Sequence, residues 1–282
     1  FNYVSKKKGG AAKDKKAAEA KLAALRDGSY QNAPDEKGVN PDAGKTNEEL
    51  IAECEKKIEK AQRILDFKPI FGCEMYCARR TKSDKKTKED RSGWHLVVLA
   101  KNETGYHNLV KLVSRSWIDG FYMKPRTDKA DLEQFKEGLI ISSACLGGEI
   151  PRKILTGDLQ GAEEAVMWFK KTFGEDYYLE LQRHEVKDPA QRANRETYPL
   201  QVQANKVLLE LAEKCGVKYI CTNDSHFADE ENAEAHDLLI CLSTNHFVND
   251  PTRMLYSKQE WFKTQAEMNE VFADLPEALA RS

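Results

Sequence analysis

From Phe67 onward, the chain alternates short apolar runs with stretches whose apolar residues recur at helical spacing. One helical stripe consists of Tyr106, Leu109, Val113 and Trp117. Strand-length runs that alternate with helices predict parallel pairing, and their uniformly apolar character predicts a sheet covered on both faces or closed into a barrel. The sequence therefore predicts an α/β fold. The runs expected to be strands are residues 69–77, 95–100, 139–145, 177–181 and 219–222.

The first 66 residues differ in composition. Lys, Glu, Ala, Gly and Asp dominate, and Tyr30 is the one aromatic residue between Val4 and Asp66. Such a segment has few large side chains with which to build a core, so we expect residues 9–66 to be a charged, partly helical insertion. Its first part, residues 9–45, is expected to be a loop with some helix around residues 15–26. The second part is expected to be a helix with a capping box and one apolar stripe, formed by Thr46 with Glu49 and by Leu50, Cys54, Ile58, Ala61 and Leu65.

The overall charge excludes a generally basic protein that coats nucleic acid. The chain has 44 Lys and Arg against 46 Asp and Glu, a formal charge of −2. No window approaches the roughly 18 apolar residues of a membrane span, and no signal peptide opens the chain. We therefore expect a cytoplasmic protein. The seven cysteines are odd in number and lie mostly in apolar runs, which predicts buried thiols and not a disulfide framework.

Candidate metal ligands follow the apolar runs. Functional groups in parallel α/β folds gather at the C-terminal ends of strands, where Cys145, His184 and the Asp-x-His pair Asp224 and His226 occur. The two side chains of that pair point to the same side of an extended segment, as a metal centre requires. Glu74 is a carboxylate among apolar neighbours, where an unpaired charge is costly. Taken singly, each residue is more often a helix cap or a structural group, and it is their conjunction that points to a metal site.

Other features have simpler interpretations on spacing alone. His95 opens its run instead of closing it, which favours a partly buried structural histidine. Lys124 and Arg126 follow a helix beside Tyr122 and could grip a phosphate backbone, although an ordinary surface loop explains them as well. The string Ala-Cys-Leu-Gly-Gly-Glu could hold an anion on its backbone N–H groups, but a tight turn is the simpler interpretation. P-loop, GxGxxG, GxSxG and HExxH motifs are absent.

Five strings occur in a family-specific order. The first begins His-Leu-Val-Val-Leu-Ala-Lys at residue 95, and the others are Gly-Phe-Tyr-Met-Lys-Pro-Arg, Ser-Ala-Cys-Leu-Gly-Gly-Glu-Ile, Tyr-Leu-Glu-Leu-Gln-Arg-His and Thr-Asn-Asp-Ser-His-Phe. In this order they closely resemble the N-terminal polymerase and histidinol phosphatase (PHP) domain of bacterial DNA polymerase III alpha subunits. The resemblance covers Phe67 to about Tyr256, together with a helix stub at residues 1–8.

The resemblance implies a distorted (β/α)7 barrel at residues 67–260, followed at residues 261–282 by the start of a connection to a polymerase region. It also implies a cluster of divalent metals, Zn, Mn or Mg, at the C-terminal strand ends. The family's first metal motifs, a His-x-His and an Asp-His pair, lie upstream of a helix that resembles residues 1–8, so we expect an N-terminally truncated domain with incomplete metal occupancy. By motif match, the ligands are Glu74, His95, Cys145, Asp224 as a possible bridge between metals, and His226, with His184, Lys124 and Arg126 as secondary candidates.

The resemblance implies a role in DNA replication within a parent that is a DNA-directed DNA polymerase, a nucleotidyltransferase. The polymerase carboxylates lie well downstream in the family, so this chain is not expected to synthesise DNA. The domain itself is expected to act as a metal-dependent 3′–5′ exonuclease or phosphoesterase. The alternative is an inactive scaffold that binds a separate proofreading exonuclease subunit, and a small-molecule phosphatase explains the metals but not the polymerase-like strings. The partners implied are DNA, a proofreading exonuclease subunit and a sliding clamp.

Overall fold

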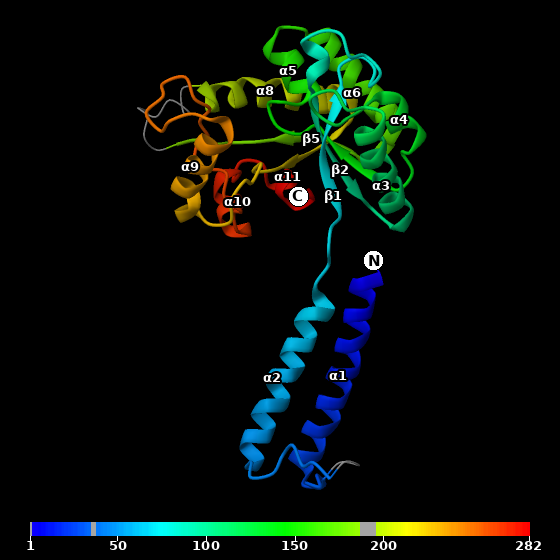
Figure 1. The fold of residues 1–282 in the computed structure, drawn as a ribbon, viewed down its shortest axis with the longest axis vertical. Coiled ribbons are helices and arrows are strands. Elements are labelled where there is room, and N and C mark those ends of the chain that lie inside the picture. Colours follow the sequence, from blue (N-terminus) through cyan, green and yellow to red (C-terminus); the bar gives the residue numbers. More distant parts are fainter. Residues whose placement is uncertain (1, 35–37, 187–195) are drawn as a thin grey trace. The chain divides into compact units, whose positions relative to one another are not determined.

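The computed structural model describes residues 2–34, 38–186 and 196–282. The chain divides into two compact units, residues 1–70 and residues 71–282, which we call the helical hairpin and the α/β domain (Figure 1). None of the described helices is long and apolar enough to cross a membrane.

The helical hairpin consists of α1 (Asn2–Asp27) and α2 (Asn47–Asp66), which pack against each other along their lengths. Its apolar core is small and consists of Leu25, Leu50 and Cys54. The predicted capping box opens α2, because the Thr46 side chain accepts from the Glu49 backbone N–H while the Glu49 carboxylate accepts from the Thr46 N–H. The apolar stripe predicted for this helix thus lies on a helix that begins at the expected residue.

Helix α1 is much longer than the sequence predicted. It continues through Gly9 and Gly10, so the expected boundary between residues 8 and 9 lies inside it. Each glycine costs about 1 kcal/mol relative to alanine, but an alanine-rich stretch follows, and Ala11 and Ala18 are buried in the hairpin. Lys8 Nζ also donates to the Leu65 carbonyl of α2 at 2.6 Å. Packing against α2 therefore offsets the weak helix propensity of the glycine pair.

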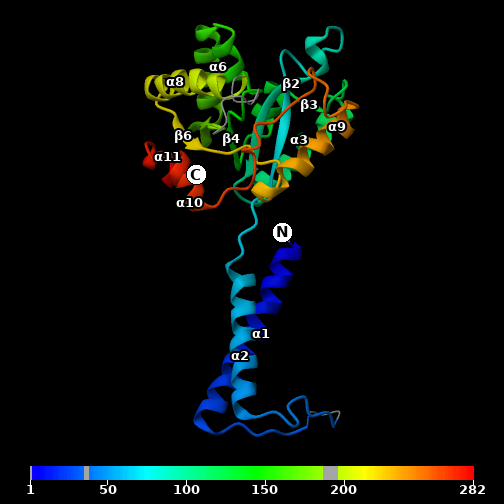
Figure 2. The ribbon, with the colours of Figure 1, turned by 90° about the vertical axis from the view of Figure 1, so that its left-hand side faces the viewer.

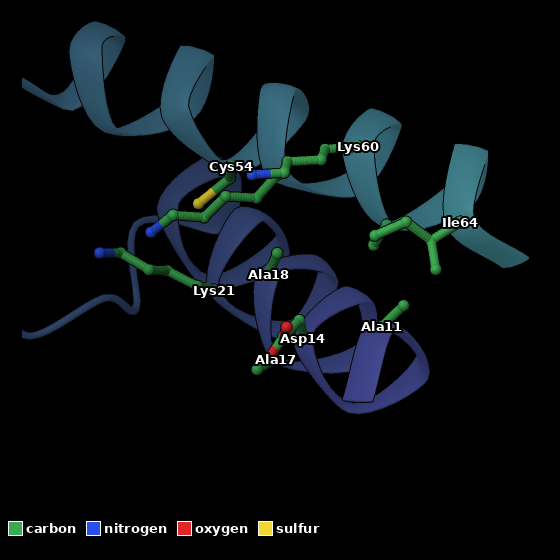
Figure 3. A pocket seen from close by; sticks show the side chains of 10 residues that line it. Ala11, Asp14, Ala17, Ala18, Lys21, Cys54, Lys60 and Ile64 are labelled. Carbon is green, nitrogen blue, oxygen red and sulfur yellow. The ribbon is translucent and has the colours of Figure 1, made fainter. Parts of the chain in front are cut away.

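A groove of about 410 Å³ runs between the two helices (Figure 3). Alanines from both helices, among them Ala18 and Ala61, line it together with Cys54. Lysines, including Lys21 and Lys60, also line it. The small side chains explain why the groove stays open, since they cannot fill the space between two helix backbones.

The α/β domain contains one six-stranded sheet in the order β3-β1-β2-β4-β5-β6. Strand β2 runs antiparallel to both of its neighbours, whereas β4, β5 and β6 are parallel. The α/β class is confirmed, but the expectation of parallel pairing throughout is wrong. Residues 79–92, which connect β1 to β2, hold only a single 3-10 turn, and a parallel return requires a crossover of a dozen or more residues that is usually a helix. The strands are β1 (Gly72–Ala78), β2 (Gly93–Ala100), β3 (Arg126–Thr127), β4 (Leu139–Ser142), β5 (Tyr177–Leu181) and β6 (Lys218–Cys221).

The described strands leave β3 and β6 at the two edges of the sheet, so barrel closure stays a prediction. Helices α3, α6 and α8 pack against the strands. Residues 261–282, expected to begin a connection, fold onto this domain, because Phe272 and Ala278 are fully buried in its core. The helices are α3 (Glu103–Ile118), α4 (Lys129–Gln134), α5 (Glu149–Leu155), α6 (Leu159–Phe173), α8 (Tyr198–Cys215), α9 (Ala233–Thr244), α10 (Gln265–Val271) and α11 (Pro276–Arg281), with 3-10 turns at η1 (Glu89–Arg91), η2 (Gly174–Asp176) and η3 (Glu230–Asn232).

The strand register gathers several loops at one end of the sheet. Ala78 at the end of β1 pairs with Gly93 at the start of β2, and Val97 of β2 pairs with Ser142 at the end of β4. The parallel neighbours β5 and β6 end on the same side. The C-terminal ends of β1, β4, β5 and β6 therefore share one end of the sheet with the start of β2. Figure 2 shows the segment between α9 and α10, drawn orange to red, passing in front of the sheet.

Candidate metal centre

A cavity of about 240 Å³ opens at this end of the sheet. All five predicted ligands line it, and so does His184. They come from strands β1 and β2 and from the loops that follow β4, β5 and β6. Cys145, Asp224 and His226, which were predicted at separate strand ends, are thus brought together with Glu74 and His95. The five are Glu74, His95, Cys145, Asp224 and His226.

Glu74, His95 and Cys145 form the tightest group in the cavity. Tyr76 pairs with His95 across β1 and β2, so Glu74, two residues before Tyr76, lies on the same face of the sheet as His95. His95 Nδ1 is 2.7 Å from Glu74 Oε1 and 3.5 Å from Cys145 Sγ. Among the residues that the structure describes, these three are the group whose possible ligand atoms all lie within 4.8 Å of one another.

The direction of β2 explains why spacing alone misjudged His95. In an antiparallel strand the first residues, not the last, lie beside the C-terminal ends of the other strands. His95 opens its run because β2 enters the sheet at the end where the cavity lies. Its backbone N–H donates to the Gly147 carbonyl at 3.0 Å, which connects β2 to the loop that carries Cys145.

The electrostatics of this group favour a positive charge at its centre. Cys145 and Glu74, which both face the imidazole, raise the pKa of His95 from its ordinary 6.5 to about 10. The hydrogen bond from His95 in turn lowers the pKa of Glu74. In the absence of a metal, the proton on His95 therefore keeps the Glu74 carboxylate and the Cys145 side chain close to the same imidazole nitrogen. A divalent cation would take over the same electrostatic role.

The loop before Cys145 is strained and tightly anchored. Ala144 has φ +60°, a left-handed conformation that residues other than glycine rarely adopt. Its N–H donates to Glu180 Oε1 at 3.1 Å. Gly147 lies directly against the His95 ring, since a Cβ placed there would be 3.0–3.1 Å from three ring atoms. The loop conformation and the position of His95 therefore depend on each other.

Asp224 and His226 lie on the loop after β6, in the same cavity but outside the three-residue group. Asp224 has φ +46°, and burial raises the pKa of its carboxyl. His226 Nδ1 is 2.6 Å from the Asp224 carbonyl oxygen, and His226 Nε2 is 3.1 Å from the Tyr256 hydroxyl. Both ring nitrogens of His226 are therefore engaged by groups of the chain.

His184 has structural partners on both ring nitrogens. Its Nε2 donates to the Asn223 carbonyl at 2.9 Å, and its Nδ1 accepts from the Gln201 amide at 3.1 Å. The side chain is buried, and burial lowers its pKa, so the neutral form is favoured. His184 thus connects the end of β5 to the loop that carries Asp224. Its role as a secondary site residue stays a prediction.

The basic pair Lys124 and Arg126 separates into two different environments. Arg126 is 1 % exposed, and its guanidinium donates to the carbonyls of Gly120, Asp84 and Lys82. It is therefore committed to the fold and not available to grip a phosphate, contrary to the interpretation that the sequence allowed. Lys124 is exposed, with its Nζ 5.7 Å from the ring centre of Tyr76, which packs edge-on against His95.

Sequence reasoning missed Glu180 of β5. This buried carboxyl accepts from the Ser142 hydroxyl, from the Ala144 N–H and from the Thr222 hydroxyl, so it joins the ends of β4, β5 and β6 beneath the cavity. Burial raises its pKa. The signal was present in the sequence, because Glu180 is a carboxylate within an apolar run, the same feature that selected Glu74.

Comparisons with known proteins agree with this architecture. A family model described as "PHP domain" matches residues 42–184. The chain is similar to the DNA polymerase III subunit alpha of Borreliella burgdorferi, with 44% identity over 225 residues that make up 79% of this chain and 19% of that protein. The Campylobacter jejuni protein of the same name is 38% identical over 231 residues, covering 78% of this chain and 18% of its own length. The Thermus aquaticus protein is 38% identical over 222 residues, covering 78% and 17%.

The chain thus spans about a fifth of the length of these relatives. The family match includes β1, β2, β4 and β5 and the Glu74–His95–Cys145 group. This chain belongs to the PHP domain family.

Proposed function

We propose that the chain is the PHP part of a bacterial replicative DNA polymerase of the DNA polymerase III alpha type, and that its cavity hydrolyses phosphodiester bonds at DNA 3′ ends with the help of divalent metals. The observation that carries this proposal is the Glu74–His95–Cys145 group, whose three possible ligand atoms lie within 4.8 Å of one another in a cavity. The relatives' shared printed name supports the polymerase context.

The donor set fits a transition metal better than it fits magnesium. Imidazole and thiolate ligands suit zinc, whereas magnesium prefers carboxylate and water oxygens. A mixed set of carboxylate, imidazole and thiolate therefore favours Zn²⁺ over Mg²⁺ and Mn²⁺. When bound, such a metal lowers the pKa of a coordinated water and neutralises charge on a phosphoryl oxygen.

The residues of the cavity have separate parts in this proposal. Glu74, His95 and Cys145 would hold one metal, and Asp224 and His226, which line the same cavity, would supply ligands for a second one, with Asp224 as the candidate shared ligand. Lys124, exposed beside Tyr76, is a candidate to contact the substrate phosphate. His184 and Glu180 act indirectly, because they fix the loops that carry Asp224 and Cys145.

The wider setting is proposed from the relatives. Nucleotide incorporation would be performed by a region outside this chain, in a parent that works with DNA, a proofreading exonuclease subunit and a sliding clamp. The helical hairpin, which includes the expected insertion at residues 9–66, would be an accessory element of the parent. The alternative is that the domain is a scaffold for the proofreading subunit and does not hydrolyse DNA.

Hydrolysis of 3′-labelled single-stranded DNA in the presence of Mn²⁺ or Zn²⁺ tests the proposal. We expect release of 3′ nucleotides by the wild type and its loss in His95→Gln. His107→Gln is the matched control, because His107 is exposed on α3 and does not line the cavity. We also expect Asp224→Ala to lower the metal content. Bound metal without hydrolysis would favour the scaffold, and equal hydrolysis in His95→Gln would place the activity elsewhere.

A further inference from the structure

Nε2 is the ring nitrogen of His226 that could offer a lone pair to a metal. The Asp224 carbonyl, 2.6 Å from Nδ1, can only accept a hydrogen bond, so Nδ1 carries the proton. In the neutral imidazole Nε2 is then the acceptor, and the Tyr256 hydroxyl lies 3.1 Å from it, in position to donate. The lone pair that a metal would use therefore already has a partner within the chain.

Residues on both sides of Tyr256 in the chain make hydrogen bonds that fix its position. Before it, Arg253 makes two hydrogen bonds to Asp237 of α9, at 2.6 and 2.7 Å. After it, the Ser257 N–H and hydroxyl both donate to Glu260 Oε1. The Tyr256 ring lies 4.6 Å from the His226 ring centre and 5.0 Å from that of His236. The hydroxyl is thus held at Nε2 by its loop and does not reach it by chance.

We infer that Tyr256 is a positioning residue whose hydroxyl competes with a divalent metal for His226 Nε2. The inference rests on the proposed function, because it concerns the metal site described above. A metal can bind at Glu74, His95 and Cys145 without breaking the hydrogen bond between Tyr256 and His226, because that bond involves none of these three residues. A metal that also uses His226 must first break the Tyr256 hydrogen bond. Tyr256 therefore weakens binding of a metal that uses His226 and leaves binding at Glu74, His95 and Cys145 unchanged.

Zinc titration calorimetry on the full chain tests this inference, with Tyr256→Phe compared with wild type. Tyr256→Phe removes the hydrogen bond that competes with the metal. We therefore expect the zinc that uses His226, the more weakly bound one, to bind about five-fold more tightly. Tyr219→Phe is the matched control, because Tyr219 lies on β6 and does not line the cavity. A second readout is the ¹⁵N spectrum of His226 in the metal-free chain. There we expect Tyr256→Phe to shift the Nε2 signal, which loses its hydrogen bond.

The outcomes separate the inference from the proposed function. Tighter binding in Tyr256→Phe, with Tyr219→Phe like wild type, supports the competition. Unchanged or weaker binding in Tyr256→Phe overturns it while the metal site stands, because a residue that merely supports His226 would weaken binding when removed. If wild type, Tyr256→Phe and His95→Gln all fail to bind zinc, the metal site itself is refuted, and the competition with it.

Discussion

Gly147→Ala is the smallest change that should disturb the cluster without removing a ligand. A Cβ at residue 147 would lie 3.0 Å from Cγ of His95 and 3.1 Å from its Cδ2 and Nδ1. Ordinary van der Waals contact begins at 3.4 Å. The imidazole must therefore move by a few tenths of an ångström, because the N–H of His95 is bonded to the Gly147 carbonyl and the two backbones cannot separate freely.

The expected magnitude follows from the tolerance of metal sites. Ligand distances are held to within about 0.2 Å in functional sites, so a displacement of a few tenths of an ångström exceeds this tolerance. Disturbing the groups that orient a ligand typically lowers metal affinity by about 10- to 100-fold. We expect a loss near the lower end, about ten-fold, because the side chain of His95 is retained. Overpacking should also lower the free energy of unfolding by about 1 kcal/mol.

Chelator competition at constant pH measures the zinc affinity, and urea unfolding measures the stability. Gly10→Ala is the matched control: Gly10 lies in α1 with nothing within 4 Å of an added Cβ. That change should raise helix stability by about 1 kcal/mol and leave zinc affinity unaltered. Zinc affinity of Gly147→Ala within two-fold of wild type would refute the reasoning, since it would show that the His95 ring is not held in place by Gly147.

Three further predictions concern the protonation of His95 and the hydrogen bonds of Glu180. Because zinc must displace the proton that Cys145 and Glu74 hold on His95, whose pKa is raised to about 10, zinc affinity should rise at least ten-fold per pH unit between pH 7 and 9, since every protonated ligand releases its proton on binding; an equally steep rise in His95→Gln would remove His95 from the site. For the metal-free chain the sign is opposite: a pKa raised above 6.5 stabilises the fold fully below pH 6.5, and thermal melting should show this stabilisation lost as pH rises towards 10. Glu180→Ala leaves Ser142, Ala144 and Thr222 without their acceptor and should lower the free energy of unfolding by about 3 kcal/mol in urea titrations. Glu175→Ala, at an exposed carboxylate, should change it by less than about 0.5 kcal/mol, and equal effects of the two changes would contradict the role given to Glu180.

Local sequence rules predicted the elements well, because the relevant signals are local. The Thr46–Glu49 capping box opens α2, and Gly216 ends α8 in the left-handed conformation that glycine commonly adopts at helix C-termini. The five apolar runs all contain strands. Helix was predicted at residues 1–8 and around residues 15–26, but not between them. The glycine pair at residues 9 and 10 is overcome by packing against α2, which is not visible in the local sequence.

The site was harder to predict, since it depends on how the strands pair. Asp224, His226 and Cys145 follow strands that end at the cavity, so the rule for parallel sheets located them. His95 required the family resemblance, because apolar periodicity does not reveal that β2 runs antiparallel. Tyr256 belongs to a segment without regular structure, and only the tertiary fold brings its hydroxyl to His226.

Metal stoichiometry tests the central claim most directly. The chain is equilibrated with zinc, freed of unbound ion and analysed for elemental zinc, beside a variant that combines Glu74→Gln, His95→Gln and Cys145→Ser. We predict at least one zinc per chain in the wild type and its loss in the variant, with both proteins folded by circular dichroism. Equal zinc content in the two folded proteins would contradict the claim that these three side chains form a metal centre.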